Sequence, residues 1–153
     1  MTRDRYETTF RSHEIIGHRY WMAAYENCLF SPHNMTPWDE PEMSVGSDHM
    51  HADGRGGIYT LRSRAMVDAA LDDTLREHLA NEWVAHKGKS WVVIGTVMLW
   101  GTVWEHETGF RGQHGRIASI DELLDGPDFS QRLTDGSVLR ALRAKYCATK
   151  EVQ

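Results

Sequence analysis

The chain has 153 residues, of which 41% are hydrophobic and 25% are charged, and its formal net charge is −5. These values are typical of one globular domain and exclude the collagen-like, intrinsically disordered and disulfide-rich classes. Lysine and arginine are scattered singly along this acidic chain, so we expect no bulk binding of nucleic acid. The scattered basic residues still allow a pocket that binds a single nucleotide.

Neither a secreted nor a membrane protein is expected. The two cysteines, Cys28 and Cys147, are too few for a disulfide framework and indicate reduced thiols in a cytoplasmic protein. Residues 1–10 are charged and lack the apolar core of a signal peptide. The longest apolar run, residues 91–104, is interrupted by glycine and threonine and is too short to span a bilayer as a helix.

A hairpin is predicted near the start of the chain. Residues 1–16 are polar, and we expect their beginning to be flexible. The run Arg19–Tyr25 is aromatic and typical of a strand, Glu26-Asn27 suits a two-residue turn, and Cys28–Phe30 returns. Residues 18–30 are therefore expected to form two antiparallel strands.

A long loop is predicted over residues 31–57. It holds three of the four prolines and is longer than an ordinary connection between elements. Loops of this length in compact domains are often functional. A short strand over residues 57–61 is expected to follow it.

Residues 63–87 are predicted to form one long helix. Ser63 is a suitable N-cap, and Gly88 can adopt the left-handed conformation that ends a helix. Apolar side chains recur every four residues along one face of this segment: Val67, Leu71, Leu75, Leu79 and Trp83.

Residues 90–105 are predicted to form a strand that is buried on both faces, because apolar residues occupy both alternating sets of positions. Gly95 and Gly101 lie inside it, and glycine within a strand often marks a bend. The pattern favours a strongly curved strand of a half-closed barrel. The chain turns at Thr108-Gly109, and residues 110–120 are expected to return.

Two helices are predicted in the remainder of the chain. Ser119-Ile120-Asp121-Glu122 has the spacing of a capping box, which predicts a short helix through Leu124. Residues 137–147 have the pattern of an amphipathic helix. The predicted fold is α+β: a small, strongly curved, mostly antiparallel half-barrel sheet with one long helix packed on it and a C-terminal helix, in a single domain over residues 1–153.

Five short motifs occur in order along the chain: Gly17-His18-Arg19-Tyr20-Trp21, Leu29-x-Ser31, Thr36-Pro37-Trp38, Gly57-Ile58-Tyr59 and Leu99-Trp100-Gly101-x-Val103-x-Glu105-His106-Glu107-x-Gly109. With these motifs the chain resembles, over residues 17–124, an uncharacterised group of small proteins from actinobacteria and their phages. The resemblance implies a shared fold and no particular activity. It also implies Cys-x-Cys before Gly-Ile-Tyr, where this chain has Gly54 and Gly56, so a zinc site on those thiols would be lost or moved to histidines.

The first candidate site is Glu105-His106-Glu107 together with Arg111. In an extended segment, Glu105 and Glu107 share one face and His106 takes the other. Such a carboxylate pair at a strand end can bind a metal, orient Arg111 or share a proton. The alternative is a solvated turn with a structural Glu–Arg pair.

The second candidate site is the pair His49 and His51, which an extended segment places on one side. Two imidazoles in this arrangement can bind zinc or another transition metal, with a third ligand from Glu105, Glu107 or His106. An exposed loop without a metal is the alternative. No cofactor is otherwise expected.

The third candidate site is aromatic. The chain has six tryptophans and nine histidines, and rings such as Tyr59 and Trp100 can stack on a planar ligand or fill the core. Trp38, in a loop between prolines, is predicted to be an exposed contact residue. Arg19 is a candidate for binding an anionic group.

Three functions follow from these candidates. The leading one is a non-catalytic binding module for a small polar or planar ligand, for example a nucleotide, because no common hydrolase signature is present. The second is a metal-dependent hydrolase that uses His49 and His51 with Glu105 or Glu107. The third is a protein-interaction factor of a phage or its host. The leading reading expects binding through Arg19, Trp38, Tyr59, Trp100, Glu105, His106 and Arg111.

Overall fold

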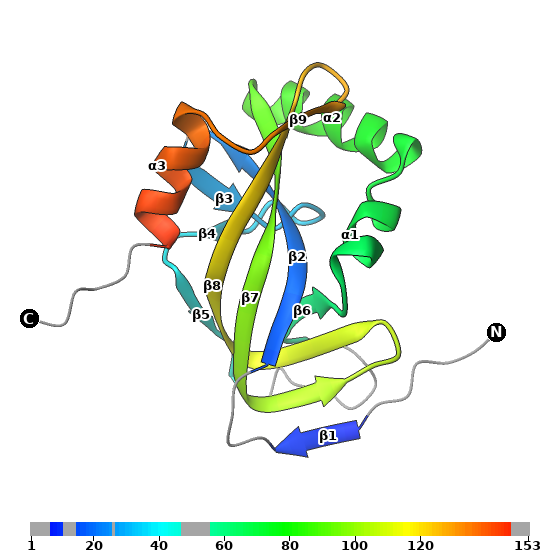
Figure 1. Ribbon diagram of the computed structural model, residues 1–153, viewed down its shortest axis with the longest axis vertical. Coiled ribbons are helices and arrows are strands. Elements are labelled where there is room, and N and C mark those ends of the chain that lie inside the picture. The colour runs from blue at the N-terminus through cyan, green and yellow to red at the C-terminus, as the bar shows by residue number, and fades with distance from the viewer. Residues whose placement is uncertain (1–6, 11–14, 26, 47–55, 148–153) are drawn as a thin grey trace, which may run out of the picture.

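Two long strands, β7 (Ser90–Glu105) and β8 (Gly109–Asp125), form the central hairpin of the molecule, as a computed structural model shows (Figure 1). The structure describes residues 7–10, 15–25, 27–46 and 56–147. These residues form an α+β fold with one strongly curved antiparallel sheet that does not close into a barrel, which confirms the predicted fold class.

The hairpin bends where glycine permits it. The register between β7 and β8 shifts at Ile94/Gly95 and again between Trp100 and Val103. Gly101 has φ +80°, a conformation that glycine adopts without strain, and any side chain at Gly95 would collide with the carbonyl of Ser119. Both glycines therefore serve the curvature that the sequence predicts.

Shorter strands complete the sheet around the hairpin. β2 (Ile15–Ala24) pairs with the first half of β7 along its whole length and forms the predicted hairpin with β3 (Cys28–Phe30). Five further short strands belong to the sheet, and two of them lie in the predicted long loop. Each of the five pairs antiparallel with its neighbour. They are β1 (Glu7–Phe10), β4 (Pro37–Trp38), β5 (Glu42–Ser44), β6 (Ile58–Leu61) and β9 (Gln131–Leu133).

The predicted long helix is two helices, α1 (Arg64–Ala70) and α2 (Asp73–Lys87). Ser63 caps α1 as expected, because its hydroxyl accepts from the amide of Met66 over 3.2 Å. The break occurs because Asp72 acts as a second N-cap and accepts from the amide of Leu75 over 2.8 Å. The apolar spacing was right, but the prediction of an unbroken helix was wrong.

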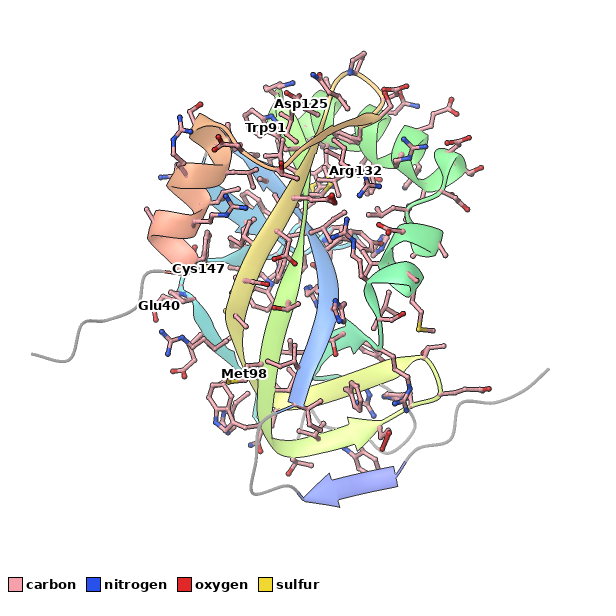
Figure 2. All side chains as sticks on the ribbon, in the orientation of Figure 1. Glu40, Trp91, Met98, Asp125, Arg132 and Cys147 are labelled. Atoms are coloured by element: carbon pink, nitrogen blue, oxygen red, sulfur yellow. The ribbon has the colours of Figure 1, made fainter. Side chains whose placement is uncertain are left out.

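The predicted short helix over residues 119–124 is wrong as well, because β8 continues to Asp125. Ser119 does not cap a helix: its hydroxyl lies 2.6 Å from that of Thr96 on β7. Glu122 instead forms ion pairs with Arg64 and with Arg132, the latter over 2.5 Å (Arg132 is labelled in Figure 2). Pairing with both β7 and β9 outweighs the local capping signal here.

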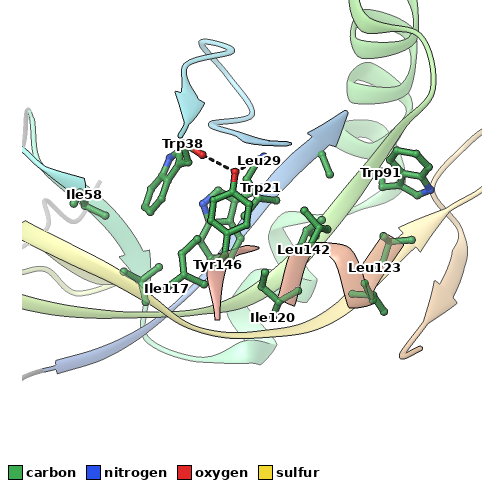
Figure 3. Close-up of a cluster of buried hydrophobic side chains, with 14 of the residues drawn as sticks. Trp21, Leu29, Trp38, Ile58, Trp91, Ile117, Ile120, Leu123, Leu142 and Tyr146 are labelled. Atoms are coloured by element: carbon green, nitrogen blue, oxygen red, sulfur yellow. Dashed lines mark hydrogen bonds between the residues drawn. The ribbon is translucent and has the colours of Figure 1, made fainter. Parts of the chain in front are cut away.

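Helices cover both faces of the sheet, α1 and α2 on one side and α3 (Ser137–Tyr146) on the other (Figure 1). Each face has its own apolar cluster, because successive residues of β2 point to opposite sides. The α3 side includes Trp21, Trp38, Leu142 and Tyr146 (Figure 3), and the α1–α2 side includes Met22, Val67, Leu79 and Trp83.

None of the helices in the described ranges is long and apolar enough to cross a bilayer.

Candidate functional site

A cavity of about 290 Å³ opens where β2 and β6 separate. The two strands pair only at His18 and Leu61, and an unbroken antiparallel register would place Arg19 opposite Thr60 and Tyr20 opposite Tyr59, where no pair forms. The separation occurs because β2 goes on to pair with β3, while β6 stays paired with β8. The described residues that line the cavity are His18, Arg19, Tyr20, Pro32, His33, Tyr59, Thr60, Leu61 and Ala70.

Gly17 lies next to the His18–Leu61 pair, at the end of the opening where the two strands are still paired. A side chain at Gly17 would collide with the side chain of Thr60 on β6, so only glycine lets the strands approach there. Arg19 and Tyr20, two and three residues further along β2, belong to the lining of the cavity. A tight contact thus lies directly beside the mouth of the cavity.

Arg19 bridges the opening with its side chain. Its Nη1 donates to the carbonyl of Tyr59 over 2.8 Å, and its Nη2 donates to the hydroxyl of Ser31 over 3.1 Å. The guanidinium carbon lies 5.0 Å from the ring centre of Trp38 and 5.8 Å from that of Trp21. This position satisfies part of the guanidinium and encloses it between aromatic rings.

The charge of Arg19 has no acidic partner among the described residues. Its hydrogen-bond acceptors are a carbonyl and a hydroxyl, and its Nε is buried without a hydrogen-bond partner there. Burial lowers the pKa of Arg19 to about 10, and the neighbouring Tyr20 raises it in part. The guanidinium therefore stays charged at neutral pH, at a cost in desolvation.

Aromatic side chains form the walls of the cavity. The hydroxyl of Tyr20 lies 2.8 Å from Nε2 of His33, and the two rings meet edge to face. Burial raises the pKa of Tyr20, which keeps its phenol neutral at physiological pH. Tyr59 on the opposite strand is 47% exposed and presents a further ring.

The lining holds no carboxylate among the described residues, although the chain as a whole has a net charge of −5. Arg19 is its charged member. The cavity therefore combines one permanent cation with aromatic walls.

The predicted residues Glu105, His106 and Arg111 form a separate cluster at the β7–β8 turn. Arg111 is 0% exposed and His106 is 3% exposed. Arg111 Nε donates to His106 Nε2 over 2.9 Å, so this imidazole accepts at Nε2 and carries its proton on Nδ1. Arg111 Nη1 also donates to the carbonyl of Gly56 over 2.6 Å.

Arg62 is a member of this cluster that sequence reasoning missed. Its Nη2 lies 2.9 Å from Oε2 of Glu105 and also donates to the carbonyl of His106 over 2.6 Å. Its Nε donates to the carbonyl of Glu107 over 3.0 Å. The sequence feature that could have identified Arg62 is its position directly after β6, because the end of β6 pairs with β8 where β8 leaves the turn. These contacts hold the turn in place, and none of these four residues belongs to the described lining of the cavity.

Tyr59 connects the two places. Its carbonyl accepts from Arg19 at the cavity, while its ring stacks on His106 with centroids 5.9 Å apart and an interplanar angle of 24°. Arg111 lies 5.7 Å from the centre of the same ring. The buried turn cluster can thus fix the orientation of a residue that lines the cavity.

The two predicted tryptophans lie elsewhere. Trp38 is 3% exposed and packs edge to face on Trp21 at 5.6 Å, so the prediction of an exposed contact residue was wrong. Its ring N–H donates to Ser31 over 3.1 Å. Trp100 stacks on His114 with centroids 5.5 Å apart, away from the described lining of the cavity.

The predicted metal ligands His49 and His51 lie outside the described residues. Within the described ranges, no group of three or more His, Cys, Asp or Glu side chains is placed to hold a metal ion. The zinc hypothesis therefore stays a prediction.

Comparison of the chain with protein-family models, with curated proteins and with solved structures gives no match. The resemblance over residues 17–124 stays a prediction. The class that fold and site define is an α+β domain with a half-barrel sheet and one aromatic, cationic cavity at a strand opening.

Proposed function

We propose that this chain is a non-catalytic binding module for a small polar, planar ligand, which occupies the cavity between β2 and β6. One observation carries the proposal: the lining combines the aromatic side chains of Tyr20, His33 and Tyr59 with the charged Arg19. Ligand pockets typically combine apolar or aromatic walls with a few polar groups that fix orientation.

The size of the cavity supports a ligand with a single ring. At about 290 Å³ the cavity is at the lower end of the range for small-molecule sites. Such a space suits one aromatic or heteroaromatic ring with a polar substituent. For a nucleotide, either the base or the phosphate would extend beyond the cavity.

The metal-dependent hydrolase and the protein-interaction factor remain alternative predictions. The hydrolase depends on His49 and His51, which lie outside the described residues. The interaction factor would make its contacts through an exposed Trp38 and an acidic surface, and of these Trp38 is buried. No further observation favours either alternative over a binding module.

A screen of small planar compounds by amide NMR tests the proposal. We expect single-ring compounds to shift the amide signals of Tyr20, Thr60 and Ala70, which line the cavity on three different elements. Substitution of Ala70 by Leu is expected to weaken those shifts, because the larger side chain enters the cavity. The matched control is Ala85→Leu on α2, which is exposed and outside the lining. Absence of any compound that shifts the three signals together would refute the proposed function.

A further inference from the structure

Arg19 has donor capacity that the described protein does not use. A guanidinium has five N–H donors in a planar fork, suited to a carboxylate or phosphate. In Arg19, Nη1 and Nη2 each donate to a neutral oxygen, and the buried Nε has no partner among the described residues. For a half-buried guanidinium with only neutral acceptors, these bonds compensate poorly for the lost hydration of its charge.

Several other arginines in the described ranges do not share this condition. Five of those described form ion pairs with carboxylates: Arg62, Arg64, Arg76, Arg132 and Arg140. Arg143 resembles Arg19, because it donates to the backbone carbonyls of Ile120 and Asp121 over 2.8 Å and 3.3 Å. Arg143, however, is not in the lining of the cavity.

The rest of the lining offers no negative charge that would repel an anion. The described lining contains no Asp or Glu, and burial raises the pKa of Tyr20, so its phenol stays a neutral donor. His33 is in hydrogen-bond contact with that phenol, and His18 lies on the same strand. An anionic group at Arg19 would therefore meet no carboxylate in the described lining.

We infer that the ligand of this cavity is a planar organic acid, a single ring whose carboxylate or phosphate group binds Arg19. The inference rests on the proposed function and specifies its ligand class. The oxyanion supplies the missing counter-charge at the strand opening, while Tyr20 and Tyr59 face the ring. A charge-assisted hydrogen bond of this kind is about twice as strong as a neutral one.

The experiment compares matched probes of nearly equal shape. Benzoate and benzamide differ in charge but hardly in size, and phenyl phosphate carries the other oxyanion on the same ring. Each is titrated at constant ionic strength while the amide signals of Tyr20, Thr60 and Ala70 are followed. We expect at least one of the two acids to bind about tenfold more tightly than benzamide. The stronger of the two identifies carboxylate or phosphate as the preferred group.

Variants of Arg19 test its role directly. Arg19→Gln keeps a polar amide but has no charge, and it should reduce the affinity of the acids to that of benzamide. Arg143→Gln is the matched control and should leave all affinities unchanged. Arg19→Lys keeps the charge without the fork and should retain part of the preference for acids.

The outcomes separate the inference from the proposed function. If wild-type protein binds benzamide as tightly as both acids, the anionic ligand class is wrong and the binding module stands. If Arg19→Gln folds and keeps the preference for acids, Arg19 is not the anion site. If neither the acids nor any neutral planar compound shifts the cavity signals, both the inference and the proposed function fail. The first comparison needs no variant, so a misfolded variant does not prevent a decision.

Discussion

Arg19 donates a hydrogen bond to the carbonyl of Tyr59 over 2.8 Å at the point where the pairing of β2 with β6 ends. A side chain thus joins the two strands where their backbones no longer pair. The same guanidinium is the charged group of the cavity. The structural link and the proposed binding site therefore depend on one residue.

The first prediction separates these two roles of Arg19. Arg19→Ala removes the donor to Tyr59 and to Ser31, and we expect it to lower the free energy of unfolding by about 1–3 kcal/mol. Arg19→Gln keeps a polar amide and removes the buried charge, so it should lower the free energy of unfolding by less than Arg19→Ala. Urea unfolding measures both. Arg140→Ala, whose side chain is 65% exposed, serves as the control and should change stability by at most about 1 kcal/mol. Equal losses in Arg19→Ala and Arg140→Ala would contradict the structural role.

The second prediction concerns pH. Burial raises the pKa of Tyr20 in the folded state, so its contribution to stability is present below about pH 10, the value in the unfolded chain, and is lost as pH rises. Burial lowers the pKa of Arg19 to about 10, so the cost of its charge is full at neutral pH and declines above that value. The two neighbours therefore give opposite slopes at alkaline pH.

Tyr20→Phe removes one of these slopes. We expect the unfolding free energy of this variant to fall less steeply between about pH 9 and about pH 11 than that of wild-type protein. Urea unfolding across this range provides the measurement. Tyr25→Phe, at a residue that is 59% exposed, is the comparison for removal of a tyrosine hydroxyl at the surface. A Tyr20→Phe curve parallel to wild type would show that Tyr20 does not titrate differently on folding.

The sequence was sufficient for the strands whose pattern extends over many residues. The apolar run of β7 and its two internal glycines predicted a curved, doubly buried strand, and the structure bends there. Prediction from the sequence failed where pairing between distant segments competes with a local signal. Ser119 and Glu122 look like a capping box, yet both make contacts to other elements, Thr96 and Arg64, that no local pattern contains.

The candidate site was only partly accessible from sequence. Arg19 and Tyr59 were named from their residue types, and both line the cavity. Their meeting depends on where β2 exchanges β6 for β3 as a neighbour, which is a property of the sheet topology. Trp38 was taken for a contact residue because prolines flank it, but pairing of β4 with β3 buries it.

The third prediction tests the bend in β7. Gly95→Ala places a methyl group against the carbonyl of Ser119, a backbone atom that cannot rotate away. We expect a loss of about 3 kcal/mol in unfolding free energy. Gly88→Ala is the contrast: nothing lies within 4 Å of its added methyl, but φ is +75°, so the cost should be limited to about 1–2 kcal/mol of conformational strain. A Gly95→Ala variant as stable as Gly88→Ala would contradict the close approach.

The fourth prediction tests the helix break. Asp72→Ala removes the side chain that accepts from the amide of Leu75, and we expect it to cost about 1 kcal/mol. Glu77→Ala, an exposed position on the same helix, should stay within about 0.5 kcal/mol of wild type. Urea unfolding of both variants decides the matter. Equal stability of the two variants would show that Asp72 does not stabilise α2.

The fifth prediction concerns the attachment of α3 to the sheet. The hydroxyl of Tyr146 donates to the carbonyl of Trp38 over 2.6 Å (Figure 3) and accepts from the amide of Leu29 over 3.0 Å. Tyr146 is 1% exposed and Leu29 is 0% exposed, so water cannot easily replace either bond. Tyr146→Phe keeps the ring and leaves both backbone groups unpaired, and we expect it to lower the unfolding free energy by about 1–3 kcal/mol.

Amide hydrogen exchange locates the effect of Tyr146→Phe. The Leu29 amide should lose protection in the variant, because its acceptor is gone, while the Leu99 amide inside β7 should change only by the global loss of stability. The variant retains the apolar packing of the ring against this face of the sheet, so a cavity cannot account for the result. Unchanged exchange at Leu29 together with wild-type stability would mean that packing alone, and not this hydroxyl, attaches α3 to β3 and β4.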